Sequence, residues 1–323
     1  MPQESIYYAV GRLSVLENTA LDKSRIDRLL QASGLDEAER VLAEIGWPGG
    51  RDWEAAAARH MQTACTLLKE LATDVRMVDA FLIRYDINNL KILLKARCLG
   101  QDSVALSPCG TVDPDVLARA VDERRYTHLP AILKETLDAL EKRLAIDIDP
   151  MDIDVTLDKA HYRMVFSLLS GKQKTALTYF RMRVDLTNGA MALRAMHAGK
   201  PAQFIQGLLI EGGSIPVKEW EKAYAKPEKL PLLFNRFGPV LYAAAVAAYI
   251  SPDKLAALER EADDGLLALY KPFRHAVDKD ERLISYLLMR EREAAAIRLI
   301  MAGKENGFDR DTMLERLREL YGR

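Results

Sequence analysis

Cysteine is scarce in this chain: three residues, Cys65, Cys98 and Cys109, occur among 323. They form no CxxC pair and no plausible disulfide framework, so we expect free thiols in a reducing compartment. The five histidines are scattered, without an HxxxH pattern and without a neighbouring cysteine pair. Metal ligation by histidine is therefore not expected, and the sequence predicts no cofactor.

Long apolar runs are missing as well. The longest, residues 240–250, contains 11 residues, whereas a membrane-spanning helix needs about 20. The start, MPQESIYYAVGR, has no basic leader followed by an apolar core, so we expect no signal peptide. The prediction is a chain with no transmembrane segment of its own, and any work at a membrane would require other proteins to hold it there.

Neither sign of charge is in excess. Lys and Arg number 46, Asp and Glu 47, and the formal net charge is −1. A nucleic-acid partner is not expected, because such proteins favour a strongly basic face. The alternation typical of strands is also absent, while Ala, Leu, Glu, Lys and Arg dominate. The sequence therefore predicts an all-α fold.

One amphipathic stretch stands out, RYDINNLKILLKARCLG, residues 84–100. Apolar residues recur at helical spacing along one stripe, formed by Ile83, Ile87, Leu90, Leu94 and Cys98. A second stripe is polar and basic, formed by Arg84, Asn88, Lys91 and Lys95. Gly100 is expected to end the helix, because glycine adopts the left-handed conformation without a Cβ penalty.

The chain repeats this stretch twice. The second copy, RVDLTNGAMALRAMHAG, spans residues 183–199, and the third, EREAAAIRLIMAGKENG, spans residues 291–307. Each copy is followed by two apolar residues five positions apart. A triplicated helical unit is our working hypothesis. Its signature residues, taken here as structural, are Asp86, Asn89 and Lys91 in copy 1, Asp185 and Asn188 in copy 2, and Glu293 and Arg298 in copy 3, where Ala296 replaces the asparagine.

This pattern, across nearly the whole chain, resembles the C subunit of the prokaryotic A-type and V-type rotary ATPases, whose eukaryotic counterpart is the d subunit. The resemblance is carried by residues 85–91, 184–188 and 291–298, with Gly303 and Lys304. Two departures stand out. The family usually has Asn where this chain has Ala296, and Leu-Arg where it has Gly189-Ala190.

The resemblance implies an all-α fold of three pseudo-symmetric helical bundles, arranged as a funnel around a pseudo-threefold axis. The expected modules are residues 1–150, 151–250 and 251–323, with the N-terminal residues as candidates to pack against the third. It also implies a non-catalytic central-stalk subunit at the cytoplasmic face of the membrane. Its partners would be the D-type and F-type shaft subunits and the proteolipid ring. It would pass torque between them for proton or sodium transport or for ATP synthesis.

Two other functions stay open at this point. One is an all-α repeat scaffold that binds partner helices in a groove. The other is an all-α enzyme that uses magnesium at the aspartate cluster of residues 147–154. That cluster lacks the glycine and the terminal glutamate of a calcium loop, so an acidic linker at a helix N-terminus is the favoured interpretation.

For two further stretches we favour a purely structural interpretation over a binding role. The basic residues Lys91, Lys95 and Arg97 are expected to form a solvated face. The apolar run at residues 240–250 is expected to be buried core.

Overall fold

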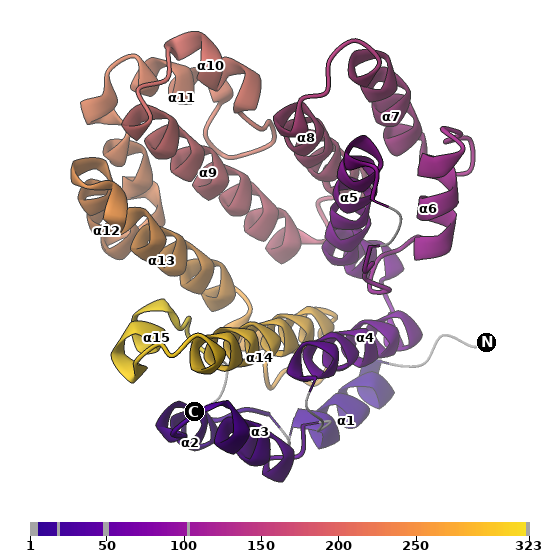
Figure 1. Ribbon diagram of the computed structural model, residues 1–323, viewed down its shortest axis with the longest axis vertical. Helices are drawn as coiled ribbons and strands as arrows, with labels where there is room; N and C mark the ends of the chain where they lie inside the picture. Colours follow the sequence, from indigo (N-terminus) through magenta and orange to yellow (C-terminus); the bar gives the residue numbers. More distant parts are fainter. Residues whose placement is uncertain (1–5, 18–19, 48–51, 102–103, 321–323) are drawn as a thin grey trace. The chain divides into compact units, whose positions relative to one another are not determined.

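The structure is a computed structural model that describes residues 6–17, 20–47, 52–101 and 104–320. Within these ranges the chain is helical and contains no β-strand (Figure 1). The all-α prediction is confirmed. The chain divides into two compact units, one formed by residues 1–75 together with 253–323 and the other by residues 76–252.

The first unit combines helices from both ends of the chain. Helix α14 packs against α1, α3, α4 and α15, and α13 packs against α15 (Figure 1). The third copy of the repeat lies in α14, so its neighbours include helices from the start of the chain. The helices of this unit are α1 (Ile6–Leu16), α2 (Lys23–Gln31), α3 (Leu35–Glu44), α4 (Trp53–Leu71), α13 (Leu255–Ala268), α14 (Glu281–Glu305) and α15 (Arg310–Arg316), with the 3₁₀ turn η5 (Lys271–Phe273).

The second unit contains copies 1 and 2, in α5 and α9. Helix α7 packs on α8, α8 packs on α9, and α9 contacts α10 and α11. The helices of this unit are α5 (Val75–Leu99), which begins at the last residue of the first unit, α6 (Pro114–Asp122), α7 (Ala131–Leu144), α8 (Pro150–Leu168), α9 (Lys174–His197), α10 (Ala202–Leu208), α11 (Val217–Tyr224) and α12 (Pro239–Ile250), with the 3₁₀ turns η2 (Pro227–Lys229) and η3 (Pro231–Phe237). The 3₁₀ turn η4 (Pro252–Lys254) lies where the units meet in the sequence.

The predicted apolar stripe of copy 1 forms part of a core. Ile83, Ile87, Leu90 and Leu94 are buried in one cluster with apolar residues of α6, α7 and α8, and Cys98 packs against it partly buried. Burying such side chains removes apolar surface from water, which is the main driving force for folding. The helix begins nine residues before Arg84, at Val75, so the stretch chosen from the sequence is the C-terminal part of a longer helix.

All three copies end in the same way. Gly100, Gly199 and Gly307 each have a positive φ, between 62° and 69°. Each glycine N–H donates to the carbonyl three residues earlier, and the next N–H donates to the carbonyl five residues earlier. This is the Schellman arrangement, which satisfies two carbonyls that a helix end leaves unpaired. The equivalence of the three stretches therefore extends to their C-terminal caps.

The sequence pattern also predicts a capping box that starts a helix at Asp36, and this expectation was wrong. Asp36 and Glu39 fit a capping box in the sequence, but α3 begins at Leu35 after Gly34, which provides no side-chain cap. Glu37 instead accepts hydrogen bonds from the backbone N–H (2.8 Å) and hydroxyl (2.6 Å) of Ser33. Glu37 thus fixes the residue before the N-cap, the chain enters the helix at Leu35, and Asp36 lies inside the first turn instead of capping it.

Candidate functional site

The signature residues of copy 1 hold the loop that follows α5. The Asp86 carboxylate accepts hydrogen bonds from Thr111 through its backbone N–H and its hydroxyl (2.7 Å each) and from the Val112 N–H (3.1 Å). Asn89 exchanges two hydrogen bonds with the backbone of Ser107, at 2.8 and 2.9 Å. Both signature side chains are fully buried. We call this aspartate–asparagine pair, three residues apart on one helix, the clamp.

Copy 2 repeats the clamp at the corresponding residues. Asp185 accepts hydrogen bonds from the backbone N–H groups of Ser214 (2.7 Å) and Ile215 (3.1 Å). Asn188 exchanges two with the backbone of Ile210, at 2.8 and 2.9 Å. Both signature side chains are again fully buried. A buried polar group needs such partners because its desolvation is costly when it is left unpaired.

A glycine stands against each clamp aspartate. A Cβ at Gly110 would lie 1.9 Å from Asp86 Oδ1, and one at Gly213 would lie 2.1 Å from Asp185 Oδ1. Only glycine lets the loop backbone approach the carboxylate this closely. The segments Gly-Thr-Val at 110–112 and Gly-Ser-Ile at 213–215 are therefore a second repeated signature, one that the alignment of the repeat helices alone does not include.

Copy 3 uses the same helical position differently. Glu293 is buried, and its Oε1 accepts a hydrogen bond from the Leu21 N–H at 2.7 Å, across 272 residues. Its Oε2 lies 2.8 Å from Arg290 Nη1 and 3.1 Å from His60 Nε2. His60 in turn stacks on Trp47, with ring centroids 4.1 Å apart. The third carboxylate therefore joins the end of the chain to its beginning instead of holding the loop that follows its own helix.

The two kinds of carboxylate have opposite pKa shifts. Burial raises the pKa of Asp185 above its ordinary value, although the N–H groups of Ile215 and Ser214 and the charge of Arg236 oppose this. Burial acts in the same direction on Glu293, but His60, Arg290 and the Leu21 N–H together lower its pKa. The difference is that copy 3 adds a buried cation where copy 2 offers mainly backbone dipoles.

The basic signature residues also differ between copies. Lys91 Nζ lies 2.7 Å from Asp158 of α8, and the neighbouring Lys95 and Arg97 pair with Asp154 and Glu141 at 2.7 Å. The expectation of a solvated basic face was wrong, because α7 and α8 supply carboxylates opposite these bases. Arg298 of copy 3, by contrast, is exposed.

The glycine of copy 2 that departs from the family pattern has a packing role. A Cβ at Gly189 would lie 2.2 Å from Phe234 and 3.1 Å from Trp220. Phe234 and Trp220 are both fully buried, with ring centroids 6.0 Å apart. Two large aromatic side chains thus occupy the space that a side chain at position 189 would need.

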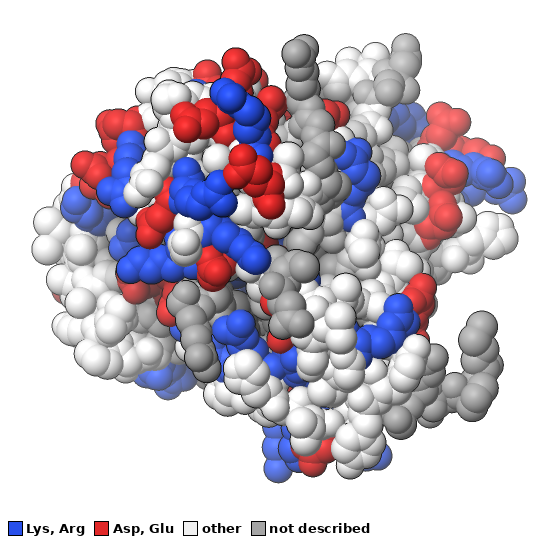
Figure 2. Space-filling model, turned by 90° about the horizontal axis from the view of Figure 1, so that it is seen from below, with Lys and Arg blue, Asp and Glu red and all other residues white. Residues whose placement is uncertain are grey.

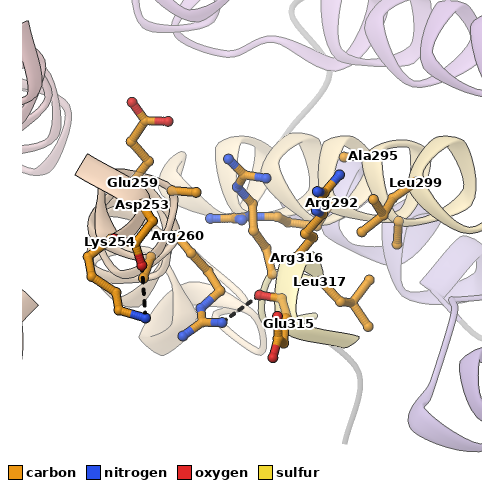
Figure 3. Close-up of a pocket in the computed structure, with 14 residues that line it drawn as sticks. Asp253, Lys254, Glu259, Arg260, Arg292, Ala295, Leu299, Glu315, Arg316 and Leu317 are labelled. Atoms are coloured by element: carbon orange, nitrogen blue, oxygen red, sulfur yellow. Dashed lines mark hydrogen bonds and ion pairs between the residues drawn. The ribbon is translucent and has the colours of Figure 1, made fainter. Parts of the chain in front are cut away.

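Arg292, Ala295 and Leu299 of α14 line a groove (Figure 3). Ala296, which is 4% exposed, also belongs to its lining. The groove has a volume of about 740 Å³ and lies between α13, α14 and residues 315–318. Lys254 pairs with Asp253 at 3.2 Å, and Arg260 donates to the Glu315 carbonyl at 2.6 Å. Dashed lines mark both interactions in Figure 3. At the corresponding position in copies 1 and 2, the clamp asparagine binds a loop.

The aspartate cluster before α8 has local partners. Asp149 caps the helix by accepting from the Met151 N–H at 2.8 Å. Asp152 pairs with Arg143 at 2.7 Å, and this guanidinium lowers the pKa of Asp152. Asp154 pairs with Lys95. Among the residues that the structure describes, no group of histidine, cysteine and acidic side chains is arranged to hold a metal ion.

The apolar run at residues 240–250 is only partly core. Helix α12 buries Leu241, Ala245 and Ala248, while Val240 and Ile250 are exposed. The expectation of a core helix was therefore too broad, since a helix that is apolar on every side buries only the face that meets a neighbour.

The family comparison agrees with this repeated geometry. The sequence profile of the family described as ATP synthase (C/AC39) subunit matches residues 9–316. The chain belongs to this family. The resemblance to the C subunit of the A-type and V-type ATPases is thereby confirmed, and the family places the chain among the non-catalytic subunits of these complexes.

Three curated relatives illustrate the similarity. The C subunit of the V-type sodium ATPase of Enterococcus hirae is 24% identical, over 93% of this chain and 94% of the relative. The C subunit of the A-type ATP synthase of Desulfurococcus sp. (strain SY) is 28% identical, over 98% and 90%. That of Methanosarcina mazei is 24% identical, over 96% and 92%. In the described part of this chain, no helix is both long and apolar enough to cross a membrane.

Proposed function

We propose that this member of the C/AC39 family is the central-stalk subunit that joins the rotating shaft of an A-type or V-type ATPase to its membrane ring. The single observation that carries the proposal is the family match over residues 9–316. In this role the chain binds D-type and F-type shaft subunits on one side and the proteolipid ring on the other. It passes torque between them at the cytoplasmic face of the membrane, as a peripheral subunit.

The physical requirement for this role is stiffness, and the interior of the chain supports it. Each long repeat helix is fixed by buried hydrogen bonds to backbone and not by apolar packing alone. The clamps at Asp86 and Asp185 hold loops, and Glu293 holds the segment at Leu21. Directional bonds of this kind resist sliding between elements, whereas apolar contacts are non-directional.

We assign the signature residues a structural role on the same grounds. Asp86, Asn89, Asp185, Asn188 and Glu293 have their polar atoms bound to the chain itself, in repeated positions. The three modules at residues 1–150, 151–250 and 251–323, closed as a funnel, complete the proposal. The wide mouth would accept the foot of the shaft and the narrow face would rest on the ring.

The charge distribution on the surface drawn in Figure 2 is compatible with a subunit that binds several partners. Basic and acidic side chains are interspersed on this face, in keeping with the net charge of −1. Mixed charge sets the register and specificity of a docked partner more than its raw affinity.

A bridging assay tests the proposal directly. Tagged D-type and F-type shaft subunits are mixed with detergent-solubilised proteolipid ring, with and without the full chain, and the tagged fraction is recovered. The ring is expected in that fraction only when the chain is present. Glu305→Gln serves as a control variant, because Glu305 is exposed at the end of α14. This variant should recover as much ring with the shaft subunits as the unaltered chain does. Equal recovery of ring with and without the chain would contradict the proposal.

Coupling is tested in reconstituted vesicles. A complex assembled without this chain is expected to hydrolyse ATP without driving ion uptake, because the shaft then turns without moving the ring. Adding the chain should restore ion uptake to the same preparation. If uptake per ATP were the same in both preparations, the chain would have no part in torque transfer.

A further inference from the structure

A small cavity in the second unit has a chemical character that the clamp does not explain. It has a volume of about 210 Å³ and is lined by residues of α5, α8 and α9, the helices that carry or adjoin copies 1 and 2 (Figure 1). Its wall is partly aromatic, and Phe81, Tyr179 and Phe180 pack against one another there, with centroids 4.7 to 5.2 Å apart. A liquid water occupies about 30 Å³, so the cavity has room for a small polyatomic ion.

The charged side chains that line this cavity are unbalanced in sign. Its lining includes three cations, Arg84, Lys91 and Arg183, against one carboxylate, Asp158. Lys91 pairs with Asp158 at 2.7 Å, while Arg84 and Arg183 donate to the hydroxyls of Tyr85 and Tyr179, at 2.9 and 3.1 Å. The two arginines occupy equivalent positions of copies 1 and 2, two residues before each clamp aspartate. The lining thus carries two more positive charges than negative ones.

His161 of α8 is the second observation. It lines the cavity, is 7% exposed, and its buried Nε2 has no hydrogen-bond partner in the described chain. Burial, reinforced by the three neighbouring cations, lowers the pKa of His161 to about 3. The ring is therefore neutral at physiological pH, and in its Nε2–H tautomer it has one N–H to donate into the cavity. A buried ring nitrogen left unpaired costs free energy, so a polar occupant at this position is favoured.

We propose that the cavity between α5, α8 and α9 binds an oxyanion of the phosphate class, held by Arg84, Arg183 and the Nε2–H of His161. Guanidinium groups suit such a ligand because their planar N–H groups match its oxygens. The aromatic wall lowers the local dielectric constant and so strengthens the attraction. The ligand is either free phosphate or the terminal phosphate of a nucleotide, and it would tie the repeat helix of copy 1 to that of copy 2.

Titration calorimetry with the full chain and inorganic phosphate, replacing chloride at constant ionic strength, tests the proposal. Saturable binding at one site is expected. Arg183→Gln should weaken it roughly tenfold or more, because a charge-assisted bond is lost. Asp158→Asn should tighten it, since the one carboxylate in the lining is removed. Lys174→Gln removes the same charge from an exposed position of α9 outside the lining and should leave affinity within about twofold, because exposed charges are screened.

Two measurements separate binding from stability. Circular dichroism melting shows whether each variant folds, and phosphate should raise the melting temperature of the unaltered chain more than that of Arg183→Gln. Arg183→Lys keeps the charge and should recover part of the affinity. In NMR spectra, phosphate should shift the His161 ring signals and raise its pKa, while His128, which lies outside the lining, should not respond.

The source of the phosphate is decided by a parallel titration with ADP. Binding of either phosphate or ADP that is lost in Arg183→Gln and strengthened in Asp158→Asn supports the site. Binding of neither, or equal weakening by Lys174→Gln and Arg183→Gln, overturns it.

Discussion

The clamps of copies 1 and 2 and the carboxylate of copy 3 share a helical position but differ in what they hold. Asp86 and Asp185 bind loops 25 to 30 residues ahead in the sequence. Glu293 binds the backbone of Leu21, 272 residues behind it. In copies 1 and 2 the carboxylate is accompanied by a loop glycine and an asparagine. In copy 3 the carboxylate belongs to a longer glutamate side chain, and its neighbour is Arg290.

This difference shows that the three copies share the position of the buried carboxylate on the helix but not the groups that the carboxylate binds. A buried carboxylate at this position needs backbone N–H donors. In copies 1 and 2 the loop after the helix supplies them. In copy 3 the N-terminal segment takes the place of that loop. The first unit is therefore built from both ends of the chain, whereas the second is continuous.

The largest effect is expected at Glu293. Glu293→Ala removes a carboxylate that is nearly fully buried and leaves Arg290, 5% exposed at its side chain, without it. Breaking a buried pair in this way costs about 3–5 kcal/mol. Urea unfolding should show this loss, while the exposed Glu305→Gln changes stability by about 0.5 kcal/mol or less. A small loss at Glu293 would mean that the chain ends are held by other contacts.

The asparagines of the two complete clamps should be equivalent. Asn89→Ala and Asn188→Ala each leave one backbone N–H and one carbonyl unpaired, at Ser107 and Ile210. Each should cost about 1–3 kcal/mol in urea unfolding. The comparison would fail if one substitution were silent, because the two copies would then differ energetically despite their matching hydrogen bonds.

The loop glycines provide a steric version of the same test. Gly110→Ala and Gly213→Ala place a methyl group within 2.1 Å of a clamp carboxylate oxygen or closer, and each should cost about 1–3 kcal/mol. Gly207, in α10, has open space around its Cβ direction. Gly207→Ala is expected to be neutral or stabilising by up to about 1 kcal/mol. Thermal melts of the three variants decide the matter, and equal effects would contradict the steric argument.

pH should act on the two kinds of carboxylate in opposite directions. The pKa of Asp185 is raised above its ordinary 3.8, so stability is lost as pH rises from 3.8 through the folded pKa. The pKa of Glu293 is lowered below 4.5, so its contribution is present above 4.5 and is lost as pH falls through the folded pKa.

Urea unfolding between about pH 3 and pH 7 measures both contributions. Asp185→Asn should reduce the loss of stability with rising pH, and Glu293→Gln should reduce the loss with falling pH. The same pH profile in both variants would show that the two carboxylates do not differ as described.

The smallest effect is expected from restoring the missing asparagine. Ala296 is 4% exposed but lines the groove, so the added amide of Ala296→Asn would extend into the groove, where water can solvate it. Its stability should change by about 1 kcal/mol or less, in contrast to the loss at Asn89 and Asn188. A large gain would reveal a loop partner for copy 3, and calorimetry would detect it.

Much of the local structure was predictable. The helical period identified the stripe through Ile83 and Leu94, and the aligned glycines at 100, 199 and 307 all end their helices. Both follow from properties of neighbouring residues: periodic burial and the conformational freedom of glycine. The capping box at Asp36 was wrong, because α3 begins one residue before Asp36 and Glu37 binds Ser33, the residue before the N-cap.

The candidate site was predictable only in its hydrogen-bond acceptors, the carboxylates. Asp86, Asp185 and Glu293 could be aligned, but the partners of Glu293 lie far away in the sequence and share no motif. The ion pairs of Lys91 and Lys95 were missed for the same reason, since their acids lie on α8. The match between residues 110–112 and 213–215 is a signal in the sequence that could have located the partners of both clamp aspartates.

By itself, the sequence determined the helices, their repetition and their caps, because these depend on side chains within a few residues of one another. It also placed a carboxylate at one position in each copy. Only the tertiary structure decided which backbone each carboxylate binds, and therefore that copy 3 closes on the start of the chain. Burial forces every such group to find a donor, but the distance along the chain to that donor is set by packing.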